Sequence, residues 1–231
     1  MGTKRLHSRG IFVTGTDTGV GKTVVAASVC AALAGRGERV AAFKPVVTGL
    51  DEPAGEWPPD HELLASVANV GQTPEDVSPA RFGPPVSPHL AAELAGTALE
   101  PHELVRAAKA VGERADVLVC EGVGGLMVPL TSGYLIRDFA LDLDLPLVIA
   151  ARPGLGTISH SLLAVDAARA AGLDVQAVVL TPWPEEPSEI ERSNRETIAT
   201  LASVAVATLP RATPADLADA GATLPIDDWL R

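Results

Sequence analysis

The fold of this chain is decided by the nine residues Gly15-Thr16-Asp17-Thr18-Gly19-Val20-Gly21-Lys22-Thr23. An apolar run at residues 11–14 precedes them, and a helical pattern at residues 24–33 follows. Strand, glycine-rich turn, Gly-Lys-Thr and helix form the context that a phosphate-binding loop (P-loop) requires, although the first glycine stands one position early. Backbone N–H groups of such a turn point at phosphate oxygens, and the helix N-terminus adds its positive end. The sequence therefore predicts a nucleotide site, with Lys22 at the β- and γ-phosphates and the Thr23 hydroxyl on Mg²⁺.

The composition favours a globular cytoplasmic protein. The chain has 231 residues, of which 47% are hydrophobic and only 3% aromatic, so Ala, Val and Leu must fill the core. The N-terminus lacks an apolar signal, and no apolar run approaches the ~18 residues of a membrane span. A formal net charge of −11 argues against a nucleic-acid partner. Cys30 and Cys120 are interpreted as small buried residues and not as a disulfide or metal pair.

Six short apolar runs predict one α/β domain over residues 1–231 with a doubly wound, mostly parallel sheet of the P-loop NTPase kind. The runs are continuous and do not alternate, as strands covered on both faces require. They lie at residues 11–14, 40–43, 117–120, 146–150, 175–180 and 204–207. Helical patterns lie between most of them, at residues 24–33, 104–114, 157–171 and 188–201. In the first helix, Val25, Val29, Ala32 and Leu33 define one apolar face.

The sector at residues 49–101 is rich in proline and differs from the rest. It contains two helix-like pieces, at residues 60–67 and 89–94, and apolar residues spaced for packing. We therefore predict a loop-rich insertion on the single domain and not a linker between two domains.

Ligands of open α/β sheets bind at the carboxyl ends of the strands, where three charged residues stand out. Lys44 ends one strand before Pro45, and anionic neighbours would keep it protonated; the alternative is an ordinary surface lysine. Its place at an open strand end predicts that replacement by Ala lowers turnover with little effect on folding. Asp60 begins a helix and fits either an N-cap or a Mg²⁺ ligand. Glu121 directly follows the strand at residues 117–120 and precedes three glycines within four residues, where P-loop proteins place a second metal contact.

Four sequence motifs together resemble the dethiobiotin synthetase family. These are the loop at residues 15–23, Lys-Pro-Val-Val-Thr-Gly at 44–49, Ser-Pro-His at 87–89 and Cys-Glu-Gly-Val-Gly-Gly at 120–125. The resemblance runs in order from about residue 11 to residue 212. It implies closure of a ureido ring on 7,8-diaminopelargonic acid with CO₂, ATP and Mg²⁺. One substrate amine forms a carbamate that attacks the γ-phosphate, and the second amine expels phosphate from the resulting anhydride.

The resemblance also implies the roles of individual residues. Lys22 and Lys44 bracket the phosphoryl group, and Thr23, Asp60 and Glu121 hold Mg²⁺. Thr18 and Thr48 contact the diamine or carbamate. The nucleotide is bound by Gly19, Val20, Gly21, Lys22, Thr23, Val24, Glu121, Gly122, Val123, Gly124, Thr181, Pro210, Arg211 and Ala212. The family forms a homodimer in which the substrate carboxylate meets the partner's helix N-terminus, which corresponds to Gly154, Leu155, Gly156 and Thr157.

Two positions depart from the family pattern. Gly19 stands where an acidic residue is frequent. The strand at residues 175–180 usually ends in an Asn that reads the adenine edge, but here Thr181, Pro182 and Trp183 follow. Loss of that amide predicts weaker base selection, so that CTP or GTP can replace ATP.

Three other classes of P-loop protein are less compatible with the sequence. A regulatory switch related to the partitioning ATPases would carry a signature lysine where Asp17 stands. An amidoligase of the cobyrinic-acid type would need a glutaminase partner or domain, for which this chain has no room. A nucleoside-monophosphate kinase would leave the motif at residues 44–49 unexplained.

Overall fold

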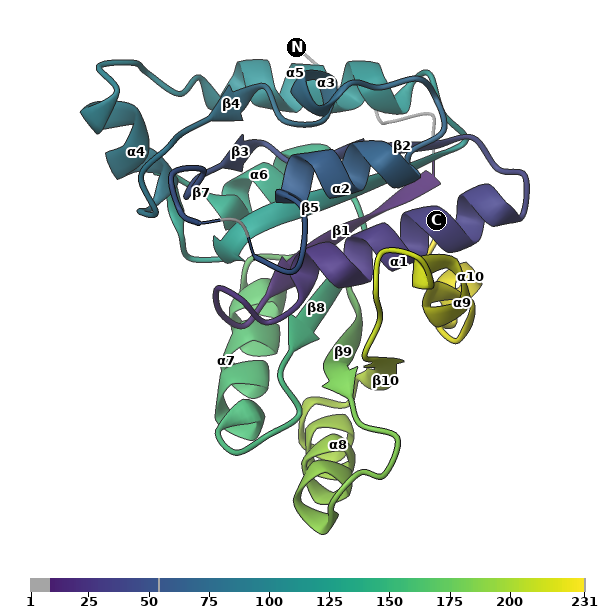
Figure 1. Cartoon of the computed structure of the whole chain (residues 1–231). Coiled ribbons are helices and arrows are strands. Elements are labelled where there is room, and N and C mark those ends of the chain that lie inside the picture. Colours follow the sequence, from purple (N-terminus) through teal and green to yellow (C-terminus); the bar gives the residue numbers. More distant parts are fainter. Residues whose placement is uncertain (1–8, 54, 231) are drawn as a thin grey trace.

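The computed structural model describes residues 9–53 and 55–230 and contains a central parallel sheet (Figure 1). Its strand order in this part of the chain is β10-β9-β8-β1-β5-β2. The strands are β1 (Arg9–Gly15), β2 (Val40–Phe43), β5 (Val117–Gly125), β8 (Leu147–Ala151), β9 (Val175–Trp183) and β10 (Ala205–Pro210). The doubly wound α/β fold and all six predicted strands are therefore confirmed, although most strands extend beyond the predicted bounds.

Strand β1 lies at the point where the order of the strands reverses. Its neighbours are β5 on one side and β8 on the other, and both pairings are parallel. From β1 the chain runs to the edge strand β2, returns to β5, and then crosses to β8, β9 and β10. Because ligands of such sheets bind at this switch point, the loop that follows β1 lies where a ligand is expected.

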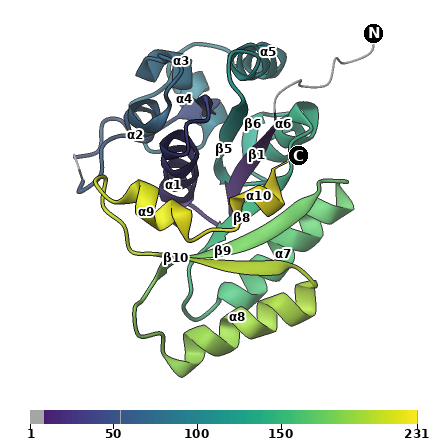
Figure 2. The same cartoon turned by 90° about the vertical axis from the view of Figure 1, so that its right-hand side faces the viewer.

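Helices cover both faces of the sheet (Figure 2). Their bounds are α1 (Lys22–Gly35), α2 (Asp60–Val67), α3 (Pro74–Val77), α4 (Pro88–Leu94), α5 (Pro101–Gly112), α6 (Ile136–Leu143), α7 (Thr157–Ala170), α8 (Glu189–Ala202), α9 (Leu217–Ala222) and α10 (Ile226–Trp229). Ile11 and Val13 of β1 belong to the core beneath α1, α2, α9 and α10. Phe12 points to the opposite face, into the core formed with α5, α6, α7 and α8.

Helix α1 is buried more completely than its sequence predicts. Besides the expected apolar face, Ala26, Ala27, Ser28 and Cys30 are fully buried. The reason is that α1 is packed between the sheet and α9. At Gly221 of α9, any side chain would collide with the Ser28 carbonyl, so this glycine permits the close approach of the two helices.

The proline-rich sector is more ordered than a loop. Helix α2 has the predicted bounds, and α4 begins one residue earlier than predicted. The sector also contains α3 and a short strand, β4 (Ala80–Arg81), which pairs with β3 (Val46–Val47) beside Lys44. Helices α6, α9 and α10 and the hairpin of β6 (Pro129–Thr131) and β7 (Tyr134–Leu135) were also not predicted. Within the described residues, no helix is long and apolar enough to cross a membrane.

Candidate active site

Lys44 joins three elements of the fold at the carboxyl end of β2. Its ammonium donates hydrogen bonds to Glu121 Oε1 of β5 at 2.6 Å and to Asp60 Oδ2 of α2 at 2.5 Å. The side chain is only 4% exposed. Pro59, not Asp60, occupies the N-cap position of α2, so the N-cap interpretation of Asp60 is wrong. The Asp60 carboxylate instead pairs with the lysine.

Glu121 lies inside β5 and not after it, because the strand continues to Gly125. Its side chain is fully buried, and Oε1 also accepts a hydrogen bond from Thr23 Oγ1 at 2.9 Å. Oε2 has no hydrogen-bond partner among the described residues. Such a free carboxylate oxygen is an available ligand for a cation.

The oxygen atoms of Thr23, Asp60 and Glu121 therefore converge around Lys44. One hydroxyl and two carboxylates are ligands that suit Mg²⁺. In the described part of the chain, no three residues of the His, Cys, Asp and Glu types form a metal cluster. A Mg²⁺ ion here would need phosphate oxygens and water for its remaining positions, as is usual for this ion.

The loop after β1 has the backbone form of a phosphate cradle. Gly19 and Gly21 have φ angles of 68° and 91°, which side-chain-bearing residues rarely adopt. The ammonium of Lys22 donates a hydrogen bond to the Asp17 carbonyl of the same loop at 2.7 Å. Within the described residues, the backbone N–H groups of Gly19, Val20 and Gly21 donate no hydrogen bond to another backbone group. They remain available for an anion.

The electrostatics of the two lysines differ. Burial lowers the pKa of Lys22 to about 8, even though nearby Glu121 acts in the opposite direction. Burial also disfavours the charge on Lys44, but Glu121 and Asp60 outweigh it and raise the pKa of Lys44 above its usual value. Complete burial raises the pKa of Glu121, an effect that Lys44 reduces. The Asp60 carboxyl is partly exposed; its partial burial disfavours the charged form, yet Lys44 holds its pKa below the usual value. Lys44 is thus a positive charge held by two carboxylates, whereas Lys22 loses its proton more readily than an ordinary lysine.

These groups line a cleft with a volume of about 890 Å³. Its other wall comes from the proline-rich sector, including Trp57, Pro85 and Ser87. Predicted site residues that line the cleft are Thr18, Gly19, Gly21, Lys22, Thr23, Val24, Lys44, Thr48, Asp60, Glu121, Val123 and Gly124. The remaining predicted residues do not line it: Val20, Gly122, Gly154, Leu155, Gly156, Thr157, Thr181, Pro210, Arg211 and Ala212.

Packing explains why three of these residues lie outside the cleft. The side chain of Val20 is 2% exposed and faces Gly15, so only its backbone can meet a phosphate. Gly122 packs against Phe12 and does not face the cleft. Thr181 is 2% exposed and lies directly against Gly21, beneath the loop.

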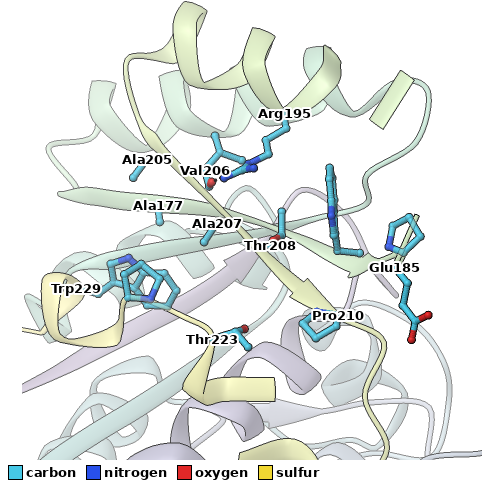
Figure 3. A pocket seen from close by; sticks show the side chains of 13 residues that line it. Ala177, Glu185, Arg195, Ala205, Val206, Ala207, Thr208, Pro210, Thr223 and Trp229 are labelled. Atoms are coloured by element: carbon cyan, nitrogen blue, oxygen red, sulfur yellow. Dashed lines mark hydrogen bonds between the residues drawn. The ribbon is translucent and has the colours of Figure 1, made fainter. Parts of the chain in front are cut away.

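A second cleft, of about 600 Å³, follows the edge strand β10 (Figure 3). Pro210 lies at one end, and Trp183, Glu185 and Arg195 contribute to its wall. Arg195 donates from Nε to the Val206 carbonyl at 3.3 Å, so one carbonyl of β10 is already occupied. Arg211 and Ala212, which follow Pro210, do not line this cleft.

The sequence did not identify two residues of the site. Trp57 lines the cleft. The sequence offered one indication of it: Trp57 lies in the proline-rich sector and is one of only three tryptophans in the chain. Arg152 follows β8 and donates to the Thr18 carbonyl at 3.1 Å. Its signal was its position directly after the strand that pairs with β1.

Comparisons with known proteins identify the family. A family model described as an AAA domain matches residues 9–215. The ATP-dependent dethiobiotin synthetase BioD of Bacillus subtilis (strain 168) is 34% identical over 198 residues, which cover 86% of this chain and 85% of the relative. The enzyme of the same name from Anaeromyxobacter dehalogenans (strain 2CP-1 / ATCC BAA-258) is 41% identical over 182 residues, which cover 78% and 80%.

Among solved structures, two cell-division proteins share the fold. The septum site-determining protein MinD of Pyrococcus horikoshii OT3, complexed with Mg-ADP, matches with a TM-score of 0.52 at 16% identity. The match covers 92% of this chain and 86% of the MinD chain. A chain of the MinC:MinD complex of Aquifex aeolicus matches with a TM-score of 0.52 at 13% identity. This match covers 95% of the present chain and 88% of the other chain. At these identities the likeness concerns the fold alone, whereas the curated relatives match in sequence along most of their length. The chain therefore belongs to the dethiobiotin synthetase family and is an ATP-dependent ligase of biotin biosynthesis.

Proposed function

We propose that the Lys44 cleft closes the ureido ring of dethiobiotin from 7,8-diaminopelargonic acid and CO₂, with cleavage of a nucleoside triphosphate. The observation that carries the proposal is the position of Lys44, a buried and fixed ammonium held between Glu121 and Asp60 and facing the same cleft as Lys22. Two positive charges that face one cleft suit a reaction in which negative charge moves between a carbamate and a phosphoryl group.

The proposed reaction has three steps. One amine of the substrate adds to CO₂ and loses a proton, which gives a carbamate. A carbamate oxygen then attacks the γ-phosphorus and releases the nucleoside diphosphate, which gives a carbamic–phosphoric anhydride. The second amine attacks the anhydride carbonyl and loses a proton, which closes the ring, and inorganic phosphate leaves with the bridging oxygen. The substrate supplies every nucleophile, so the protein's task is positioning and charge stabilisation.

Individual residues would divide this task. Lys44 would stabilise the carbamate and the transferring phosphoryl group, and Lys22 would hold the β- and γ-phosphates. Thr18 and Thr48, which both line the cleft, would contact the diamine or carbamate. Thr23, Asp60 and Glu121 would hold Mg²⁺, which neutralises phosphate charge. The unpartnered Oε2 of Glu121 supports this assignment.

The nucleotide base would lie at the carboxyl ends of β9 and β10. Thr181 of β9 packs against Gly21, so the end of β9 lies beside the phosphate-binding loop. Strand β10 pairs with β9, and a base at these strand ends would therefore be near Pro210, Arg211 and Ala212. The buried side chain of Thr181 offers no amide to a base edge. We therefore propose that ATP, CTP and GTP are all accepted.

The substrate carboxylate would be bound by a second copy of the chain. Gly154 to Thr157 do not line the cleft of their own subunit. Leu155, two residues before the start of α7, is 96% exposed, and Leu163 in the middle of α7 is 65% exposed. The exposed Leu155 beside the helix N-terminus and the exposed Leu163 halfway along α7 support a homodimer in which this end of α7 completes the partner's site.

The test is phosphate release in the presence of Mg²⁺, ATP, 7,8-diaminopelargonic acid and bicarbonate, with each component omitted in turn. We expect release only when all four are present. Phosphate release that is indifferent to the diamine would contradict the proposal and favour a nucleotide-dependent switch.

A further inference from the structure

Arg152 lies beside the phosphate-binding loop because of the register of two paired strands. In the β1–β8 pair, Gly15 is opposite Ala150. Thr18 comes three residues after Gly15, and Arg152 comes two residues after Ala150, so both residues lie just beyond the carboxyl ends of these two neighbouring strands. The guanidinium group donates from Nη2 to the Thr18 carbonyl at 3.1 Å. This is its one hydrogen bond to the described residues 9–53 and 55–230, and no carboxylate among them lies within ion-pair distance of it.

The Thr18 carbonyl and the Gly19 N–H belong to one peptide unit. In a planar trans peptide the C=O and N–H bonds point in opposite directions. With the carbonyl held by Arg152, the Gly19 N–H must therefore point away from Arg152. This N–H has no backbone acceptor in the described part of the chain, and Gly19 lines the cleft.

Few other contacts restrain this peptide. The neighbouring N–H of Thr18 donates to Asp17 Oδ1 at 2.7 Å, and this hydrogen bond does not involve the Thr18–Gly19 peptide unit. Gly19 has a φ of 68° and no side chain that could anchor it. The atom nearest to the position of a Cβ at Gly19 is Arg152 Nη2, at 3.7 Å.

We propose that Arg152 is a positioning residue of the phosphate-binding loop, which turns the Gly19 N–H toward the nucleotide phosphates by holding the Thr18 carbonyl. A charged donor on the carbonyl also polarises the peptide and strengthens the hydrogen bond that its N–H donates. Arg152 acts through the peptide and not by contact with the nucleotide. The inference rests on the nucleotide binding of the proposed function and is independent of the ring closure.

The test compares Arg152→Met, which removes the donor, with Arg152→Lys, which retains a charge and a donor. The readouts are Kd for Mg-ATP and for Mg-ADP by titration calorimetry, and the Tm of the nucleotide-free protein. We expect Arg152→Met to raise both Kd values by a similar factor, about tenfold for a lost charge-assisted hydrogen bond, with an unchanged Tm. Arg152→Lys should restore most of the affinity.

Arg192→Met is the matched control, because Arg192 is also exposed, donates to a backbone carbonyl, that of Pro187, and lines neither cleft. It should leave both Kd values unchanged. Three results would overturn the inference: an unchanged Kd in Arg152→Met, a loss of affinity together with a lowered Tm, or a loss for ATP far larger than for ADP. The last would indicate direct contact with the γ-phosphate. Because binding is measured without the diamine, failure of the ring-closing reaction would be seen separately.

Discussion

The ammonium of Lys44 lies 2.6 Å from the carboxylate of Glu121, and both side chains are almost completely buried. Asp60 completes the arrangement at 2.5 Å from the same ammonium, with its side chain 42% exposed. Two buried charges of opposite sign compensate each other, so removal of Lys44 leaves the buried Glu121 without an ion-pair partner in a region of low polarity. The site is therefore coupled to the stability of the fold.

This pair predicts a non-additive effect on stability. Lys44→Met should lower the free energy of unfolding by about 3 kcal/mol, because the buried Glu121 loses its partner. The double variant Lys44→Met/Glu121→Gln should recover most of that loss. Urea denaturation of the wild type, both single variants and the double variant measures the coupling. This outcome differs from the expectation that Lys44 can be replaced with little effect on folding. An unchanged free energy of unfolding in Lys44→Met would restore that expectation, and additive losses would contradict the coupling.

All three variants should turn over substrate much more slowly than the wild type. Loss of the Lys44 charge should lower kcat by at least about 100-fold, including in the stable double variant. Lys109→Met on α5 is the control, since Lys109 does not line the cleft. Normal turnover in the double variant would remove Lys44 from the mechanism.

The lowered pKa of Lys22 predicts a pH dependence of nucleotide binding. Burial favours the neutral amine, so in metal-free and nucleotide-free protein Lys22 should lose its proton near pH 8. Phosphate binding needs the ammonium form, so above about pH 8 binding must take up a proton and affinity should fall as pH rises. Below that pH Lys22 is already protonated, so it should contribute no further change in affinity with pH. Since the chain has four lysines, ¹³C-lysine NMR titration with Lys22→Met for assignment measures this pKa. Titration near the ordinary value of 10.5 would contradict the prediction.

Base selection should be weak. Thr181 faces Gly21 and offers no amide to a base, so kcat/KM for ATP, CTP and GTP should agree within about tenfold. The measurement is steady-state turnover with each triphosphate in separate assays. A preference for ATP of more than about 100-fold would show that another group reads the base.

Dimerisation should depend on the exposed leucines of α7 and of the loop before it. Leu163→Glu should shift the molecular mass measured by light scattering from that of two chains toward that of one. It should also raise KM for the diamine, because the partner's helix N-terminus would be lost. Leu201→Glu on α8 is the matched control, since Leu201 is 64% exposed against 65% for Leu163. A wild-type mass of one chain would refute the proposed dimer.

Much of the fold could be predicted because each central strand is a continuous apolar run between helical patterns. The carboxyl ends of the strands could not be placed so well. Strand β5 continues through Glu121 to Gly125, where glycine and a charged residue argue against a strand. Helix α9 was missed because its packing on α1 depends on the absence of a side chain at Gly221, which resembles a turn signal in sequence.

The candidate site was predictable where motifs follow strands, and unpredictable where the tertiary fold supplies the neighbour. Lys44 and Glu121 were predicted from their positions after strands, but the ion pair between them depends on the adjacency of β2 and β5. Trp57 and Arg152 carry no motif. They reach the site because the proline-rich sector folds over the cleft and because β8 pairs with β1.

The central claim, that a carbamate oxygen attacks the γ-phosphate, is tested most directly by oxygen transfer. The enzyme is supplied with freshly dissolved C¹⁸O₂, the diamine, Mg²⁺ and ATP, and the released phosphate is analysed by mass spectrometry before the label exchanges with water. The proposed anhydride predicts one ¹⁸O atom in each phosphate, because the bridging oxygen leaves with phosphorus. Phosphate without label, formed alongside dethiobiotin, would show that water cleaves the triphosphate and would contradict the account.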